Sequence, residues 1–337
     1  MDLEALKATA QAMVAPGKGI LAIDESHGTC TKRFAALGLE CDAENRRAYR
    51  GLLVAAPGAE AAISGMILFD ETLRQSNDEG VSFPKSLEDR GIIPGIKVDT
   101  GAKDLALHPG EKVTEGLDGL RERLAEYYEL GARFAKWRAV ITIGDELPSQ
   151  ACLMANAHAL ARYAALCQEA GLVPMVEPEI LLEGPHSIEA CYGTSAETWE
   201  ILFKELAAQG VALEGLILKT SMVLPGSTCD DQADLLTIAE MTVNCLKANV
   251  PAEVAGVVFL SGGQTAEDST IRLNEMNKIG GMPWPLSFSY GRGIQAPALQ
   301  VWARDHQAIG EAQNVLVHRA KMNGLAAKGE YDISLEV

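Results

Sequence analysis

The sequence predicts an α/β protein in which eight strand–helix units form a single (β/α)₈ barrel, with an extra N-terminal helix before the first strand. Three observations support this prediction. Strand-like and helical runs alternate along the chain, β-rich runs recur about 30–45 residues apart, and charged residues gather where these runs end. The alternation by itself is also compatible with an open, doubly wound sheet.

The length of the chain suits one barrel, because 337 residues fall within the usual range for this architecture. No segment rich in Pro, Gly or Ser divides the sequence, and no run of like charges marks a tail. We therefore expect residues 1–337 to form a single domain.

Each strand-like run is short and rich in apolar or β-branched residues. The eight runs are residues 19–26, 63–69, 94–99, 133–140, 173–180, 215–222, 256–263 and 284–291. Residues 3–14 have the periodicity of a helix, and the helical spacing of apolar residues is clearest in 152–170 and 231–250. Residues 70–90 are predicted to be mostly loop.

Composition limits the partners and the compartment. The 29 basic and 46 acidic residues give a net charge of −17, which repels nucleic acid and anionic membranes. No uncharged apolar run is long enough to span a bilayer, and the N-terminus lacks the basic start of a secretory signal. The seven cysteines include no C-x-x-C motif, which indicates free thiols. We expect a cytoplasmic protein, although a mature organelle protein would share these features.

Polar and charged residues occupy the C-terminal ends of the predicted strands. They are Asp24, Ser26, Lys97, Asp99, Lys136, Arg138, Glu177, Glu179, Lys219 and Ser261, with Arg292 directly after the eighth run. Because side chains alternate across a strand, the charged set faces the barrel, whereas residues such as Trp137 and Leu218 meet the helices. Buried unpaired charges are costly, so the set predicts a functional site that contains ion pairs such as Lys136–Glu177. A structural salt-bridge network is the alternative, and the excess of cations favours an anionic substrate.

Two glycine-rich stretches follow the last two strands, where this architecture usually binds phosphate. They are Ser261-Gly262-Gly263-Gln264 and Tyr290-Gly291-Arg292-Gly293. Glycine lets backbone N–H groups approach a ligand, and a helix N-terminus favours an anion. A second anion site across the mouth is predicted from Thr29, Lys32, Arg33 and Lys97. An exposed helix start is the alternative for Lys32 and Arg33.

Lys219 lies in an apolar strand-like run, which suggests covalent chemistry. Burial favours the uncharged form of an amine, and a neighbouring cation such as Lys136 adds to this effect. An uncharged amine can attack a ketone to form a Schiff base, which accepts electrons when a nearby carbon–carbon bond breaks. Asp24, Glu177 and Glu179 could carry the required proton transfers from the same face. A lysine considered alone is more often a paired or solvent-reaching side chain.

Several motifs occur in one order along the chain and carry a resemblance to a known family. The motifs are Leu21-Ala22-Ile23-Asp24-Glu25-Ser26, Glu44-Asn45-Arg46-Arg47, Gly95-Ile96-Lys97-Val98-Asp99, Phe134-Ala135-Lys136-Trp137-Arg138, Val176-Glu177-Pro178-Glu179-Ile180, Phe259-Leu260-Ser261-Gly262-Gly263 and Phe288-Ser289-Tyr290-Gly291-Arg292. On these motifs the chain resembles class I fructose-1,6-bisphosphate aldolases over essentially its whole length. The resemblance implies a TIM-barrel lyase that cleaves fructose 1,6-bisphosphate reversibly to dihydroxyacetone phosphate and glyceraldehyde 3-phosphate. It also implies that no metal or other cofactor is needed, and the six histidines lack metal-ligand spacing.

The resemblance further implies a role for each site residue. Lys219 would form the Schiff base, Glu177 would dehydrate the carbinolamine, and Asp24 would take or orient the C4 hydroxyl proton. Lys136 would polarise the carbinolamine, helped by Arg138 and Glu179. The implied ligands of the dihydroxyacetone-phosphate end are Ser261, Gly262, Ser289, Gly291 and Arg292, and those of the 6-phosphate end are Arg33, Lys32 and Lys97. Ser26, Thr29 and Gly263 are further candidates for substrate binding.

The chain departs from the animal members of this family in three places. Thr220-Ser221 follows the lysine where Pro-Asn is usual, and His27 replaces a common threonine. The sequence ends at Val337, without the long tail whose tyrosine assists proton transfer at the enamine in animal enzymes. Substrate preference therefore stays open, with sedoheptulose 1,7-bisphosphate and fructose 1-phosphate as alternatives.

Two other function classes fit the sequence less well. A second phosphate site disfavours a transaldolase-like transfer. A binding protein built on an inactive barrel should have lost Lys219, Glu177 or Asp24, and all three are present. The resemblance also implies a homo-oligomer, with the tetramer as the common state.

Overall fold

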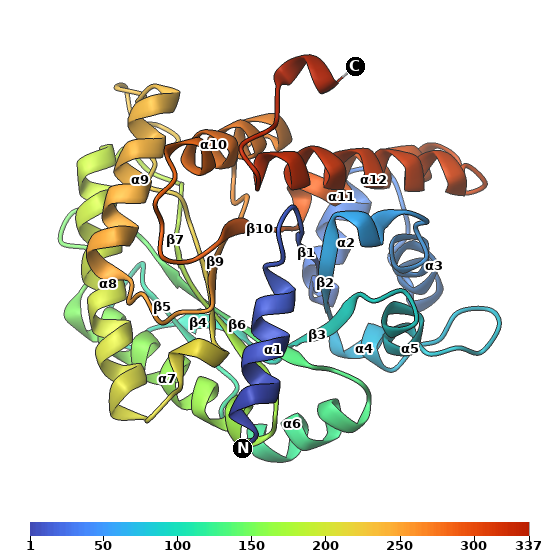
Figure 1. Ribbon diagram of the computed structural model, residues 1–337, viewed down its shortest axis with the longest axis horizontal. Helices are drawn as coiled ribbons and strands as arrows, with labels where there is room; N and C mark the ends of the chain where they lie inside the picture. Colours follow the sequence, from blue (N-terminus) through green and yellow to red (C-terminus); the bar gives the residue numbers. More distant parts are fainter. Residues whose placement is uncertain (337) are drawn as a thin grey trace.

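The computed structural model describes residues 1–336, and within this range eight parallel strands close into a barrel (Figure 1). The strands are β1 (Gly19–Ile23), β2 (Ile63–Leu68), β3 (Ile93–Lys97), β6 (Phe134–Ile141), β7 (Val173–Ile180), β8 (Ile217–Thr220), β9 (Gly256–Phe259) and β10 (Leu286–Tyr290). Ile20 of β1 pairs with Gly65 of β2 on one side and with Ser289 of β10 on the other. The sheet therefore closes on itself. The predicted barrel is confirmed, and the open sheet is excluded.

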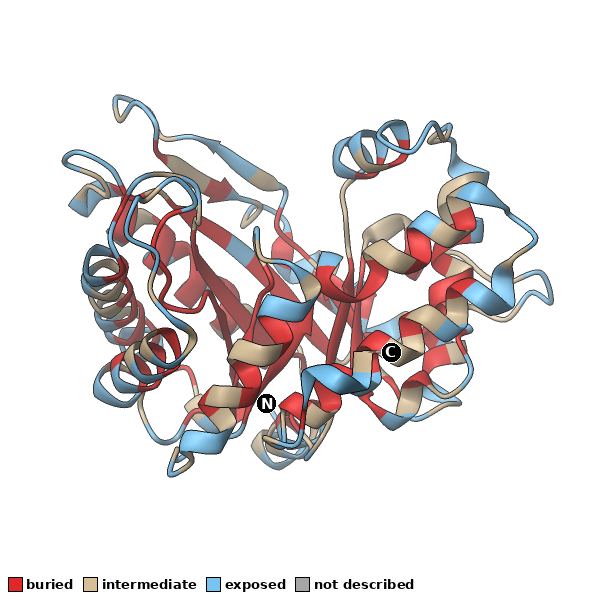
Figure 2. Ribbon diagram, turned by 90° about the horizontal axis from the view of Figure 1, so that it is seen from above, coloured by how far each residue is buried: buried red, intermediate tan, exposed pale blue. Residues whose placement is uncertain are grey.

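Helices surround the barrel and connect its strands. They are α1 (Leu3–Met13), α2 (His27–Ala35), α3 (Ala43–Val54), α4 (Asp70–Leu73), α5 (Phe83–Glu88), α6 (Leu120–Glu129), α7 (Gln150–Glu169), α8 (Ile188–Ala208), α9 (Leu235–Asn249), α10 (Ala266–Ile279), α11 (Arg292–Arg304) and α12 (Ile309–Ala326), with short 3₁₀ turns at Ala59–Ala61, Leu213–Gly215 and Ile333–Glu336. The barrel strands are mostly buried, whereas the helices expose their outer faces (Figure 2). Over residues 1–336, no helix combines the length and the apolar character needed to cross a membrane.

Side-chain caps determine where several helices begin. Ser149 accepts a hydrogen bond from the backbone N–H of Cys152 at 3.1 Å and caps α7. Asp234 accepts one from the backbone N–H of Thr237 at 2.8 Å, so α9 begins at Leu235 and not at the predicted residue 231.

Two features between β2 and β6 differ from the sequence prediction. Residues 70–90 contain the short helices α4 and α5 in addition to loop, because Ser82 caps α5 and its Phe83 and Leu87 are buried. An antiparallel hairpin of β4 (Gly101–Asp104) and β5 (Lys112–Glu115) was not predicted. Most of its residues are at least partly exposed, so it lacks the apolar alternation that identifies a strand.

The apolar core has two parts. The larger part lies between the strands and the surrounding helices, and the smaller part fills the inside of the barrel. Side chains of α1, including Leu6 and Met13, join the inner part beside Phe134, Ile217 and Val258. Burying each such side chain contributes about 1.5–3 kcal/mol. Because α1 packs against the N-terminal ends of the strands, the opposite end of the barrel is left as the open mouth.

The predicted alternation of side chains across the strands is confirmed. Trp137 of β6 and Leu218 of β8 are fully buried in the outer part of the core. Phe134 and Ile217 belong to the inner part. Two residues further along each strand, the same inward face carries Lys136 and Lys219 at the mouth.

Candidate active site

A cavity of about 560 Å³ lies at the C-terminal ends of the barrel strands. Most of the residues predicted from the sequence line it together. They are Asp24, Ser26, Thr29, Arg33, Lys97, Lys136, Arg138, Glu177, Glu179, Lys219, Ser261, Gly262, Ser289, Gly291 and Arg292. Lys32 is exposed on α2, and neither Lys32 nor Gly263 is among the lining residues. The structure thus brings the predicted set together with these two exceptions.

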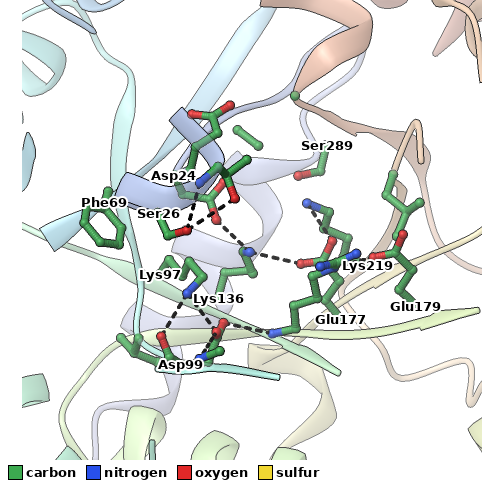
Figure 3. Close-up of a pocket in the computed structure, with 18 of the residues that line it drawn as sticks. Asp24, Ser26, Phe69, Lys97, Asp99, Lys136, Glu177, Glu179, Lys219 and Ser289 are labelled. Carbon is green, nitrogen blue, oxygen red and sulfur yellow. Dashed lines mark hydrogen bonds and ion pairs between the residues drawn. The ribbon is translucent and has the colours of Figure 1, made fainter. Parts of the chain in front are cut away.

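Two lysines and two carboxylates form the centre of the cavity (Figure 3). Lys219 Nζ lies 3.0 Å from Glu177 Oε1, and Lys136 Nζ lies 3.2 Å from Glu177 Oε2. Lys136 Nζ is also 2.6 Å from Asp24 Oδ2. The side chains of Lys136, Glu177 and Lys219 are each 5% exposed or less, so these ion pairs are hardly screened by water. The predicted Lys136–Glu177 pair is confirmed.

The ion pairs determine the protonation of this central group. Burial alone would raise the pKa of Asp24, but the nearby charges of Lys136 and Lys219 lower the pKa of Asp24 to about 2. The same two lysines outweigh burial at Glu177 and lower its pKa. Burial opposes the charged form of Lys136, but Asp24 and Glu177 raise the pKa of Lys136 well above its usual range. Both carboxylates are therefore ionised at neutral pH, and Lys136 is charged.

A ring of further ion pairs surrounds the centre. Arg138 pairs with Glu179, and the two side chains come from the neighbouring strands β6 and β7. Lys97 Nζ lies 2.7 Å from Asp99 Oδ1. Arg33 of α2 pairs with Glu25, and both residues line the cavity.

The sequence prediction missed several lining residues. Glu25 lies between the predicted residues Asp24 and Ser26, so its position at a strand end was a usable signal, whereas Asp99 belongs to the predicted charged set but has no assigned role. Arg123 and Tyr127 reach the cavity from α6, and residues 100–102 reach it from the hairpin. Nothing in the local sequence pattern indicated these contributions, because they depend on how α6 and the hairpin pack over the mouth.

The glycine-rich stretch after β9 is closely packed. A side-chain carbon at Gly262 would lie 2.9 Å from Glu179 Oε1 and 2.7 Å from Leu260, so only glycine fits there without a shift. Thr265 then caps α10 by accepting a hydrogen bond from the backbone N–H of Asp268 at 3.0 Å.

The stretch after β10 leads directly into α11, which begins at Arg292. Gly291 precedes this helix and gives it no side-chain cap, so its first backbone N–H groups are available to an anion. Ser289 Oγ is buried at the cavity, and among residues 1–336 it has no hydrogen-bond partner. These groups can bind an anion at the end of the cavity near β10.

The family model described as fructose-bisphosphate aldolase class-I matches residues 5–336. The chain belongs to the class I fructose-bisphosphate aldolase family. The family resemblance inferred from the sequence motifs is therefore confirmed.

Similar proteins match this aldolase over nearly its whole length. "Probable fructose-bisphosphate aldolase class 1" of Xanthomonas campestris pv. campestris is 60% identical, over 98% of this chain and 99% of that protein. "Fructose-bisphosphate aldolase 5, cytosolic" of Arabidopsis thaliana is 48% identical, over 96% of this chain and 90% of that protein. A co-crystal structure of fructose-bisphosphate aldolase from Plasmodium falciparum superposes with a TM-score of 0.96, at 47% identity, over 98% of this chain and 95% of that one.

Two of the three departures from the animal pattern lie within residues 1–336 of this aldolase. His27 Nε2 lies 3.3 Å from Glu71 Oε2, and its ring contacts Phe69 edge-on at the rim of the cavity. Ser221 Oγ donates to the backbone carbonyl of Ile180 at 2.8 Å and is not among the lining residues. The third departure concerns the chain end at Val337, which lies outside the described residues.

Tyr331 lies on the outside of the barrel. Its hydroxyl donates to Glu336 Oε1 at 2.8 Å, and its backbone N–H donates to Asn274 of α10 at 2.9 Å. It is not among the residues that line the cavity of this aldolase.

The cysteines of this aldolase form no disulfide within residues 1–336. All seven cysteines are free thiols, as the sequence predicted. Over residues 1–336, His, Cys, Asp and Glu side chains form no group of three or more that could hold a metal ion.

Proposed function

We propose that the protein cleaves fructose 1,6-bisphosphate reversibly to dihydroxyacetone phosphate and glyceraldehyde 3-phosphate, through a Schiff base on Lys219. The observation that carries this proposal is the contact between the Lys219 amine and Glu177, 3.0 Å apart in a buried group at the barrel mouth. Relatives named fructose-bisphosphate aldolase support the same substrate.

Formation of the Schiff base needs a group that takes a proton from the Lys219 amine and later gives a proton to the C2 oxygen, which leaves as water. Glu177 is ionised and contacts the amine, so it can accept a proton from Lys219 and free its lone pair. The amine then attacks C2 of the ketose to give a carbinolamine. Protonation of the C2 hydroxyl by Glu177 releases water and leaves the iminium, and the nearby charge of Lys136 helps to polarise this oxygen.

Cleavage of the C3–C4 bond sends the electron pair to the iminium nitrogen and gives an enamine. The proton of the C4 hydroxyl must leave at the same time. Asp24 is ionised, so its carboxylate can accept a hydrogen bond from the C4 hydroxyl and then take its proton. Because the pKa of Asp24 is low, Asp24 gives this proton up again quickly. Glyceraldehyde 3-phosphate leaves. Protonation of C3 and hydrolysis of the iminium then release dihydroxyacetone phosphate.

The two phosphates are assigned to the two ends of the cavity. Ser261, Gly262, Ser289, Gly291 and Arg292 would bind the phosphate of the dihydroxyacetone-phosphate half, with the start of α11. The residues assigned to the 6-phosphate are Ser26, Thr29, Arg33 and Lys97. Lys32 and Gly263 were also predicted to bind substrate, and they stay predictions because neither lines the cavity.

Borohydride trapping tests the covalent step. The protein is mixed with dihydroxyacetone phosphate and sodium borohydride, and the digest is examined by mass spectrometry. We expect one reduced adduct, on Lys219. An adduct on another lysine, or none, would reject the mechanism. A Lys204→Ala variant serves as the control because Lys204 is exposed on α8 and is not among the cavity-lining residues, and it should be trapped like the wild type.

Kinetics with a panel of substrates test the preference. We expect the highest kcat/KM for fructose 1,6-bisphosphate. If kcat/KM is higher for sedoheptulose 1,7-bisphosphate or fructose 1-phosphate, that sugar is the preferred substrate and this part of the proposal is wrong.

We also propose that the protein works in the cytoplasm, as one catalytic domain within a homo-oligomer. The free thiols and the relatives named cytosolic support the compartment. The pairing of β1 with β10 joins the two ends of the chain in one sheet and supports the single domain. Light scattering of the purified protein measures the oligomeric state, with a tetramer expected.

A further inference from the structure

The amine of Lys97 is held by a single neighbouring residue. Lys97 Nζ lies 2.7 Å from Asp99 Oδ1 and also donates to the backbone carbonyl of Asp99 at 2.9 Å (Figure 3). The side chains are 15% and 3% exposed, respectively. A lysine ammonium has three N–H donors, so these two contacts leave one for a ligand in the cavity that both residues line.

The carboxylate of Asp99 is itself fixed by its surroundings. Asp99 Oδ1 accepts a hydrogen bond from the backbone N–H of Gly101 at 3.1 Å, and Oδ2 accepts one from the backbone N–H of Arg138 at 3.2 Å. Asp99 therefore ties the end of β3 to the start of the hairpin and to β6. It cannot turn without breaking contacts with both elements.

We propose that Asp99 is a positioning residue for Lys97, and that the pair selects substrates with a phosphate distal to the ketose carbon that Lys219 attacks. This inference rests on the proposed function and deepens it. A free lysine side chain is flexible and loses rotamer freedom when it binds a phosphate. Asp99 already restricts the side chain of Lys97. A phosphate that binds the remaining N–H of Lys97 therefore incurs a smaller entropic cost for ordering that side chain.

The charge of Asp99 does not prevent this role. Its negative charge is balanced by Lys97, and both of its oxygens already accept N–H groups. Thr29 and Arg33 of α2 also line the cavity, so the same phosphate can meet donors on a second element. A substrate that lacks this phosphate makes no contact with the positioned Lys97 amine, so its binding is not strengthened.

The test compares two substrates that share one end. Fructose 1,6-bisphosphate has the distal phosphate, and fructose 1-phosphate lacks it. The measured quantity is the ratio of their kcat/KM values in wild type, Asp99→Asn, Lys97→Met and the double variant. Asp99 also acts on the charge of Lys136, but that effect reaches both substrates and cancels in the ratio.

We expect Asp99→Asn and Lys97→Met each to lower this ratio at least about fivefold, the scale of a lost charge-assisted contact. The double variant should fall no further than Lys97→Met alone, because Asp99 acts through Lys97. Asp104→Asn is the matched control, since Asp104 is an exposed aspartate of the neighbouring hairpin, and it should keep the wild-type ratio.

A fall of less than fivefold in Asp99→Asn overturns the inference, as does an additional fall when Asp99→Asn is combined with Lys97→Met. If circular dichroism shows that Asp99→Asn is unfolded, Lys97→Arg replaces it. Arginine keeps the charge but not the position of the amine, so the ratio should again fall at least about fivefold, and a smaller fall overturns the inference.

Trapping separates this inference from the proposed function. Wild-type protein that gives no borohydride adduct with dihydroxyacetone phosphate rejects the Schiff-base proposal itself. Normal trapping at Lys219 together with an unchanged substrate ratio rejects only the role of Asp99.

Discussion

The Lys219 amine lies 3.0 Å from Glu177 Oε1, although the two residues belong to the neighbouring strands β8 and β7. The second oxygen of Glu177 lies 3.2 Å from Lys136 Nζ, so one buried carboxylate forms ion pairs with both amines. This arrangement places a proton acceptor beside the proposed nucleophile and leads to testable consequences.

Replacement of Lys219 by arginine should abolish catalysis. Arginine keeps a positive charge beside Glu177, but its guanidinium cannot form the Schiff base. We expect kcat to fall by at least about 10³-fold, the scale on which removal of a covalent nucleophile acts. Steady-state kinetics measure the fall, and an Arg variant as active as wild type would be fatal to the mechanism.

Replacement of Glu177 by glutamine should slow the steps before cleavage. The amide cannot accept the proton of the lysine or return one to the carbinolamine. Loss of a general acid/base costs about 10²–10⁴-fold, and rapid-quench trapping should show slower formation of the adduct. The exposed Glu253→Gln variant is the control and should keep wild-type rates. Adduct formation at the wild-type rate would remove Glu177 from this step.

The ion pair of Asp24 should make stability depend on pH in the acid range. Its pKa is about 2 in the folded protein and 3.8 in the reference state, so the folded pKa is depressed. The stabilisation is therefore complete above about pH 5 and is lost as the pH falls towards 2. A depression of this size corresponds to about 2 kcal/mol.

Urea unfolding of wild type and Asp24→Asn between pH 7 and pH 3 checks this sign. The wild type should be the more stable protein at pH 7, and the difference should narrow below about pH 4. A difference that widens on acidification would contradict the assignment.

Replacement of Gly95 by alanine should destabilise the barrel. A side-chain carbon at Gly95 would lie 2.2 Å from the ring of Phe134 inside the barrel, so the ring or the strands must move. Overpacking of this kind costs about 1–3 kcal/mol or more. The control is Gly193→Ala on the exposed face of α8, which has no neighbouring atom within 4 Å and should be neutral or stabilising. Thermal unfolding of both variants measures the contrast, and equal Tm values would contradict it.

Chelation should leave the activity unchanged. The proposed mechanism uses the iminium of Lys219 as the electron acceptor, so it needs no metal for that step. Dialysis against EDTA followed by assay in metal-free buffer provides the measurement. Loss of activity that is restored by a divalent cation would show that the mechanism is incomplete.

The sequence determined the fold and most of the site because both follow from short-range regularities. Strand-like runs identified each barrel strand, and the two-residue period of a strand put Lys136, Glu177 and Lys219 on one inward face. The mouth of the barrel then followed from the positions of these charges along the strands.

Only the tertiary structure decided which groups meet. The pairs Lys136–Asp24 and Lys219–Glu177, and the approach of Arg123 from α6, depend on how separate elements pack together around the mouth. Lys32 shows the same dependence. Successive residues of a helix point about 100° apart, so of the neighbours Lys32 and Arg33 only Arg33 faces the cavity. Local periodicity sets the element and its face, whereas the register and curvature of the barrel set the contacts between residues distant in sequence.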